Sequence, residues 1–275
     1  MTSASLILAL ALAPAASTSP GPGAIPDASD AEVLAGAERA FAEGVAHRDD
    51  ADTARPRFRE AARGYDALWA RGAHNPALAI NRARAHRLAG DLPGSIAAFH
   101  DGIAAARYDR SLQVGLEDAR NAVQYPLEGD LAGRCRPRPA RTIGTRMSPA
   151  EAYIAAGIGW ALVCFGVFRF ATTRLPRALV FAGVWVVVLG ILGGLWAYDW
   201  RRQSQENALP RVVVARDVVL RKGNGESYPP RLEARLPAGV EARERARRGG
   251  WVQVELAGGE VGWLPEAGIL NTTRY

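Results

Sequence analysis

The residues best suited to chemistry in this 275-residue chain are four histidines and two cysteines, and their spacing indicates no reaction centre. The histidines show neither the H-E-x-x-H pattern nor another ligand spacing; they are His47, His74, His86 and His100. Cys135 and Cys164 belong to no CxxC or Cys/His pattern, and Cys135 is expected to be an unpaired thiol without a function. Paired carboxylates, a Ser/His/Asp set and a phosphate-binding loop are not found either. We therefore expect a protein that is not an enzyme, with no cofactor or metal, in which His86 and His100 are structural.

Two tryptophans are the next candidates, in the glycine-rich segment GGWVQVELAGGEVGWLP (249–265). The alternation of a β-strand places the valines and the leucine of WVQVEL on one face and Trp251 on the other. Trp251 is then expected on an outer face or rim, beside Trp263 from the adjoining strand. Two interpretations stay open. The tryptophans cap a small β-domain, or they form an aromatic patch that binds a peptide or a cell-wall stem.

The region that holds these tryptophans, residues 209–271, has the pattern of an all-β domain. Short β-prone runs alternate with Gly and Pro turns, at 211–215, 218–222, 231–236, 240–246, 251–256 and 260–264. Strands this short can bury a core only by curling into a small barrel or a tight sandwich. The pattern GW-x-x-V followed by G-x-x-GW resembles bacterial SH3 domains. The family's Asn-Val-Arg-Ser-Gly-Pro run is replaced here by Val219–Asn224, so peptide-binding details tied to that run do not carry over.

Residues 29–126 have a helical pattern that begins with Ser29 and Glu32, the spacing of a capping box. A repeat at an offset of 34 residues, the period of the tetratricopeptide helix–turn–helix, relates Phe58 to Leu92, Ala61 to Ser95 and Tyr65 to Phe99. The unit 76–106 resembles the tetratricopeptide consensus in its Gly90-Asp91 turn and in small or aromatic residues at 95, 99 and 102, although Ala79 replaces a frequent aromatic. A last helix, 109–124, would cap the array.

A helical repeat of this kind binds partners on the concave face lined by its first helices. In the unit 76–106 that face would carry Asn81, Arg84 and Arg87, which suit an acidic or extended peptide or a partner helix. The alternative is that the repeat only packs and holds spacing.

Two uncharged runs, 152–168 and 178–198, are long enough for helices that cross a bilayer, and together they predict a membrane hairpin over 150–200. A hairpin puts both soluble regions on the same side. Its loop carries Arg169, Arg174 and Arg177, which favours a cytoplasmic loop, whereas Arg134–Arg146 and Arg201-Arg202 lie at the other end. Residues 1–28 fit a signal peptide with the apolar core Leu6–Ala13 and a Pro/Gly/Ser-rich stretch. That signal places the soluble regions outside the cytoplasm.

The net charge of +6 and the pI of about 9.8 do not indicate nucleic-acid binding. Nearly all the positive charge is arginine, spread along helices and around the apolar runs rather than interleaved with aromatic residues on a platform. The densest group, RCRPRPARTIGTR (134–146), falls in the linker 127–149, where it would meet the anionic head groups of a lipid bilayer.

The order of these regions (signal, tetratricopeptide-like helices, linker, hairpin, SH3-like barrel) resembles the BatE-like family of bacterial aerotolerance-operon proteins. The resemblance implies a non-enzymatic scaffold in the bacterial inner membrane. Its implied partners are membrane proteins with von Willebrand A domains and a MoxR-type AAA ATPase system. The competing interpretation is a wall-binding or wall-sensing protein whose SH3-like barrel binds peptidoglycan peptides.

Overall fold

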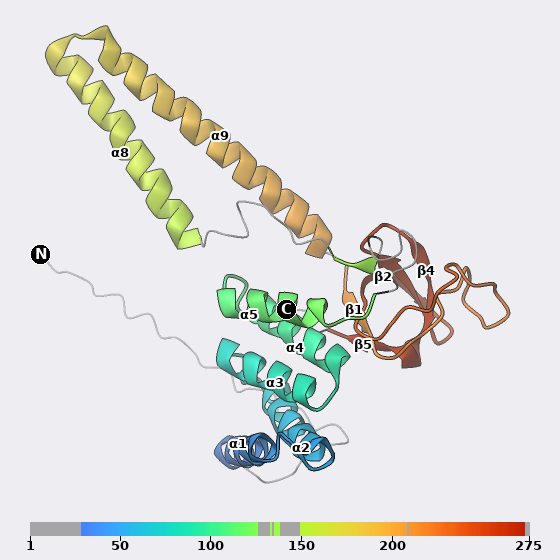
Figure 1. The fold of residues 1–275 in the computed structure, drawn as a ribbon. Coiled ribbons are helices and arrows are strands. Elements are labelled where there is room, and N and C mark those ends of the chain that lie inside the picture. The colour runs from blue at the N-terminus through green and yellow to red at the C-terminus, as the bar shows by residue number, and fades with distance from the viewer. Residues whose placement is uncertain (1–28, 126–132, 134, 138–148, 208, 273–275) are drawn as a thin grey trace, which may run out of the picture.

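The computed structural model describes residues 29–125, 133, 135–137, 149–207 and 209–272 (Figure 1). The expected signal peptide (1–28) and most of the linker therefore lie outside the described residues. What is described comprises a group of helices, a long apolar helical hairpin and a small antiparallel sheet.

The N-terminal helices are α1 (Asp30–Ala46), α2 (Ala51–Ala70), α3 (Pro76–Leu88), α4 (Leu92–Ala105) and α5 (Arg110–Asn121). The predicted capping box is confirmed, because the Glu32 amide donates to Ser29 Oγ at 3.3 Å and the Ser29 amide donates to Glu32 Oε2 at 2.7 Å. Helix α1 packs on α2, α3 packs on both α2 and α4, and α5 covers α3 and α4. A turn at 47–49 leads into α2, which has 20 residues against 14 in α4.

Small residues allow α3 and α4 to approach closely. A Cβ atom added at Gly102 would lie 2.6 Å from Ala79 Cβ, so any larger side chain at residue 102 would push the two helices apart. The same contact, together with the complete burial of Ala79, leaves room for only a small side chain at position 79.

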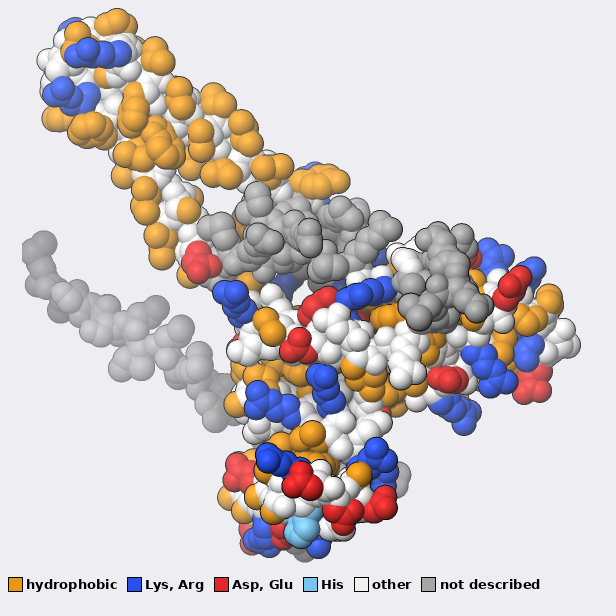
Figure 2. All heavy atoms as spheres, viewed as in Figure 1, with side chains coloured by type: hydrophobic (Ala, Val, Ile, Leu, Met, Phe, Trp, Pro, Cys, Tyr) orange, Lys and Arg blue, Asp and Glu red, His pale blue; other side chains and the backbone are white. Residues whose placement is uncertain are grey.

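Helices α8 (Pro149–Thr173) and α9 (Pro176–Asn207) pack on each other and project away from the rest of the chain (Figure 1). Both are long and apolar enough to cross a membrane, with mean hydropathies of 1.8 and 2.5. Only 17% and 6% of their most apolar windows are buried, and Figure 2 shows their outer surface covered with hydrophobic side chains. A soluble monomer rarely exposes an apolar surface this continuous.

The sheet has the order β4-β3-β2-β1-β5, with all neighbours antiparallel. Its strands are β1 (Arg211–Val214), β2 (Glu241–Arg248), β3 (Trp251–Leu256), β4 (Val261–Pro265) and β5 (Ile269–Asn271), and the short 3-10 helix η1 (Glu266–Gly268) precedes β5. The described strands form an open sheet, and a closed barrel is not shown.

The expected strands at 218–222 and 231–236 are replaced by irregular chain with isolated bridges. These bridges join Val218 to Leu236, and Arg221 to both Pro230 and Trp263. Pro229 and Pro230 have no amide hydrogen to donate, so this stretch cannot maintain a continuous ladder. Strand β5 was not expected from the sequence, because it has only three residues.

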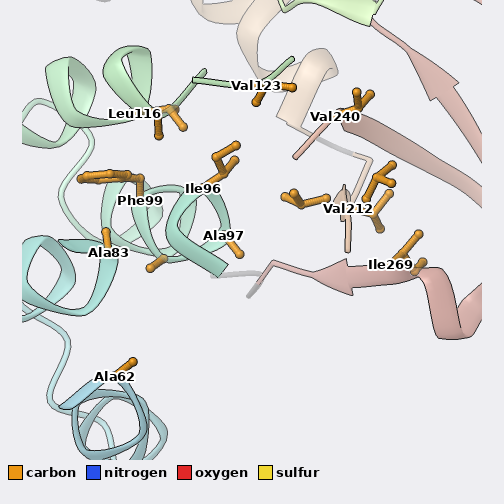
Figure 3. Packing of buried hydrophobic residues seen from close by; sticks show 14 of the residues in the cluster. Ala62, Ala83, Ile96, Ala97, Phe99, Leu116, Val123, Val212, Val240 and Ile269 are labelled. Carbon is orange, nitrogen blue, oxygen red and sulfur yellow. The ribbon is translucent and has the colours of Figure 1, made fainter. Parts of the chain in front are cut away.

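The helices and the sheet share one hydrophobic core (Figure 3). At their contact, Ile96 of α4 and Val123, just after α5, face the turn that holds Gly239. Gly239 has φ +91°, and an added Cβ would lie 2.9 Å from Val123 Cγ2 and 3.2 Å from Ile96 Cδ1. Cys135, expected in a free linker, is instead buried in the same core. The helical region and the sheet therefore form one body.

Candidate partner-binding surfaces

The three predicted groove residues lie on one side of α3, three positions apart. The helix is fixed by Pro76 in its first turn and by Asn75, whose Oδ1 accepts from the Leu78 amide at 2.8 Å. Arg84 and Arg87 are exposed, whereas Asn81 is half-buried. In the described part of the chain neither arginine forms an ion pair, so both guanidinium groups are available to an external acidic partner.

Arg82, between the predicted residues, has a different role that the sequence did not reveal. Its Nη1 donates to Asp101 Oδ2 at 2.7 Å, its Nε donates to Asp66, and its guanidinium lies 5.5 Å from the ring centre of Trp69. These partners come from α2 and α4, so Arg82 fixes α3 between them. Only 15% of its side chain is exposed, which makes it a structural residue and not part of a binding surface.

His86 belongs to the same polar cluster. Its Nδ1 lies 2.8 Å from Asp91 Oδ2 and its Nε2 lies 3.2 Å from Asp66 Oδ2, which agrees with the expected structural histidine. Burial opposes the positive charge, but the hydrogen bonds and charges of the two carboxylates outweigh it and raise the pKa of His86 to about 9. His86 is therefore a cation at neutral pH and balances the two aspartates.

Because the folded-state pKa of His86 is raised above 6.5, its stabilisation is fully present below pH 6.5 and is lost as the pH rises through about 9. We expect the imidazole NMR signals of His86, recorded on the full chain in detergent, to titrate with a midpoint near pH 9. Asp66→Asn should lower that midpoint by at least about one unit, since it removes one of the two charges. A wild-type midpoint at or below pH 7 would contradict the assigned hydrogen bonds.

An apolar cleft of about 330 Å³ lies where α1, α2 and α3 meet, and the sequence did not indicate it. Val45 and Leu88 are 43% and 47% exposed beside it, and Phe58 forms part of its wall. Arg48 and Arg55 stand at its edge. Because Leu88 follows Arg87 directly, the cleft lies next to the last residue of the predicted groove.

The predicted tryptophan pair lies on the outer face of the β3–β4 hairpin. Trp251 is opposite Pro265 and Trp263 is opposite Gln253, which makes the two tryptophans diagonal neighbours on one face. Both are half-buried, while the valines and the leucine of β3 point to the core as the alternation predicts.

Arginines border this aromatic face on both sides. Arg248 on β2 is opposite Trp251. Arg221 forms a two-way backbone bridge with Trp263: the Arg221 amide donates to the Trp263 carbonyl at 3.0 Å, and the Arg221 carbonyl accepts from the Trp263 amide at 2.8 Å. Directly opposed residues share a face, so the surface joins two indole rings to two cations. Such a surface suits an extended peptide that carries carboxylates.

A buried polar cluster joins the helices to the sheet, and the sequence reasoning missed it. Glu241 of β2 accepts from Arg120 Nε at 2.6 Å and Nη2 at 2.8 Å, and from His100 Nε2 at 2.6 Å. On the other side of the ring, Arg211 Nη1 lies 3.4 Å from His100 Nδ1. Since arginine can only donate, Nδ1 is the acceptor and His100 is the neutral Nε2–H tautomer.

The charges in this cluster are consistent with that geometry. Burial opposes ionisation of Glu241, but His100 and Arg120 outweigh it and hold the pKa of the carboxyl well below its ordinary value. Burial lowers the pKa of His100 and outweighs the carboxylate, and Arg211 and Arg120 lower it further. The result is one buried ion pair, Glu241 with Arg120, and one neutral imidazole.

Comparison with known proteins gives no relative for this chain: no family model, curated protein or solved structure matches it.

Proposed function

We propose that this chain is a non-enzymatic, membrane-anchored scaffold that docks protein partners on two surfaces. The observation that best supports this proposal is the hydrophobic core that the helices and the sheet share, together with the buried ion pair between Glu241 and Arg120. It holds the α3 surface and the tryptophan face in a fixed arrangement relative to each other. In this proposal the helices are a small tetratricopeptide-like array and the sheet is an SH3-like domain.

The hairpin anchors the scaffold as a two-pass segment of the bacterial inner membrane. The start of α8 and the end of α9 both lie nearest the rest of the chain in Figure 1, which supports placing both soluble regions on one side. The expected signal peptide at 1–28 makes the soluble body periplasmic, and Arg169, Arg174 and Arg177 at the far end then lie in a cytoplasmic turn.

By resemblance to the BatE-like family, the proposed partners are membrane proteins with von Willebrand A domains and a MoxR-type AAA ATPase system, in a complex for stress tolerance or envelope maintenance. One observation favours a second candidate. Two tryptophans with an arginine on either side would also suit the carboxylate-bearing peptides of peptidoglycan, which would make the chain a wall-binding protein.

Cross-linking in intact cells, followed by detergent extraction and mass spectrometry through a C-terminal tag, separates these candidates. For the scaffold, von Willebrand A-type membrane proteins should be recovered with or without muramidase treatment. The double variant Arg84→Glu/Arg87→Glu should reduce that recovery at least about tenfold, since hot-spot arginines at interfaces contribute 1 kcal/mol or more each. The matched control is the charge reversal Arg59→Glu/Arg63→Glu on α2, where both arginines are exposed. It should change the recovery of these proteins little.

Recovery of mainly muropeptide-linked material, abolished by Trp251→Ala/Trp263→Ala, would support the wall-binding candidate instead. If neither double variant changes what is recovered, the two surfaces do not dock partners.

A further inference from the structure

The turn of the apolar hairpin contains a second, unassigned cleft. It has a volume of about 280 Å³ and lies between the end of α8 and the start of α9. Its lining combines apolar walls with cationic and hydroxyl groups, from Phe165, Arg169, Thr173, Leu175, Arg177 and Phe181.

The local backbone fixes the shape of this cleft. Close to it, α8 and α9 meet at Gly166, where an added Cβ would lie 2.9 Å from Ala182 Cβ and 3.1 Å from the Ala178 carbonyl oxygen. At the turn, Arg174 takes the left-handed conformation with φ +55°, and its amide donates to the Phe170 carbonyl at 2.8 Å. The two helices therefore diverge from a tight contact into a defined turn, and the cleft lies between them.

The cleft carries positive charge that the hairpin does not neutralise. The sequence has no Asp or Glu between Glu151 and Asp199, while Arg169, Arg174 and Arg177 lie at the turn. None of the three arginines forms an ion pair within the described residues. Figure 2 shows the basic side chains gathered at this far end of the hairpin, with apolar side chains below them. The described residues therefore leave these guanidinium groups open to an external anion.

We propose that this cleft binds the phosphate group of an anionic phospholipid, held between Arg169 and Arg177, with the first acyl carbons against Phe165 and Phe181. Guanidinium groups match phosphate oxygens in charge and in hydrogen-bond geometry. The apolar walls, 57% exposed at Phe165 and 42% at Phe181, favour a lipid over free phosphate. The inference rests on the proposed membrane hairpin, which would put the cleft at the depth of the head groups.

Native mass spectrometry of the full chain in a neutral detergent, titrated with phosphatidylglycerol or phosphatidylcholine, tests this site. Wild type should bind the first phosphatidylglycerol in preference to phosphatidylcholine. The double variant Arg169→Gln/Arg177→Gln should weaken that binding about twenty-fivefold, from roughly fivefold for each arginine. The matched control for each single cleft variant, Arg169→Gln or Arg177→Gln, is Arg174→Gln, which also removes one charge from the turn but lies outside the cleft lining, and it should weaken binding less than about threefold. Arg169→Lys/Arg177→Lys keeps the charge without the planar fork and should give an intermediate loss.

Equal losses in Arg174→Gln and in either single cleft variant would overturn the site, because they would indicate only diffuse attraction. Displacement of the lipid by an equal concentration of inorganic phosphate would also overturn it, since the site would then recognise a free anion. A separate measurement tests the anchor: in phosphatidylcholine vesicles, wild type and variants should all resist extraction by alkaline carbonate. Extraction of every form would refute the membrane hairpin. A wild-type chain that resists extraction but shows no preference for phosphatidylglycerol would refute only the cleft.

Discussion

Glu241→Ala is expected to destabilise the contact between the sheet and the helices by about 3–5 kcal/mol, because it leaves a buried guanidinium without its carboxylate. Among the described residues, Arg120 would keep its ion pair with Glu117 at 3.7 Å, and His100 would lose the acceptor of its Nε2–H. Hydrogen exchange of the full chain in detergent measures the effect. Amides of β2 and α5 should exchange at least about a hundredfold faster.

Glu255→Ala is the matched control for this prediction. Glu255 lies on the outer face of β3 and pairs with Arg245 at 2.9 Å, where the arginine is 46% exposed. A surface pair of this kind is worth about 0–1 kcal/mol. The double variant Glu241→Met/Arg120→Met should recover most of the lost stability, since it removes both buried charges together. Equal exchange in the Glu241 and Glu255 variants would contradict the assigned role of the cluster.

The same ion pair sets the expected response to acid. Because the folded-state pKa of Glu241 lies below its ordinary value of 4.5, its stabilisation is fully present above pH 4.5. That stabilisation is lost only as the pH falls well below 4.5, through the folded-state pKa. As the pH is lowered, exposed carboxylates should therefore be protonated first, and the sheet should separate from the helices only at a lower pH.

Gly239→Val should destabilise the same contact by about 2–5 kcal/mol, for two additive reasons. The left-handed backbone at φ +91° costs a non-glycine residue about 1–2 kcal/mol. The added side chain would also meet Val123 and Ile96, and overpacking of this kind costs about 1–3 kcal/mol. Hydrogen exchange in α4 and α5 should report the loss.

Gly259→Val separates the two contributions. Gly259 has a similar φ of +86°, but no atom lies within 4 Å of its added Cβ. Only the backbone cost of about 1–2 kcal/mol should remain, and it should be confined to the β3–β4 turn. If both variants lose the same stability, the Gly239 turn is not packed against the helices.

Local patterns in the sequence predicted the elements well where one periodicity dominates. The capping box placed the start of α1 at Ser29, and the alternation in WVQVEL placed Trp251 outward. The charge-free runs indicated the apolar hairpin. The irregular chain at 218–236 was misjudged, because β-prone residues cannot form a ladder where prolines remove the donors.

The contact between helices and sheet could not be predicted, because its members are far apart in the sequence. Glu241 lies in VEARERA, a segment whose sequence predicts several outward-facing charged residues and does not single out Glu241. Its partner His100 is 141 residues away. One signal was available. Helix α4 (LPGSIAAFHDGIAA) has no Lys, Arg or Glu and is buried on nearly every side, so α3 and α5 alone could not cover it. A further element had to pack there, and it is the sheet.

The distance between the two proposed docking surfaces tests most directly whether they belong to one rigid body. Spin labels would be attached through non-natural residues at position 87 on α3 and position 257 in the β3–β4 turn, both of which are exposed. The distance between the labels would be measured by pulsed electron paramagnetic resonance in lipid nanodiscs. A shared core predicts one narrow distance distribution in wild type that broadens in Glu241→Ala. A broad distribution already in wild type would contradict it, because the helices and the sheet would then move independently.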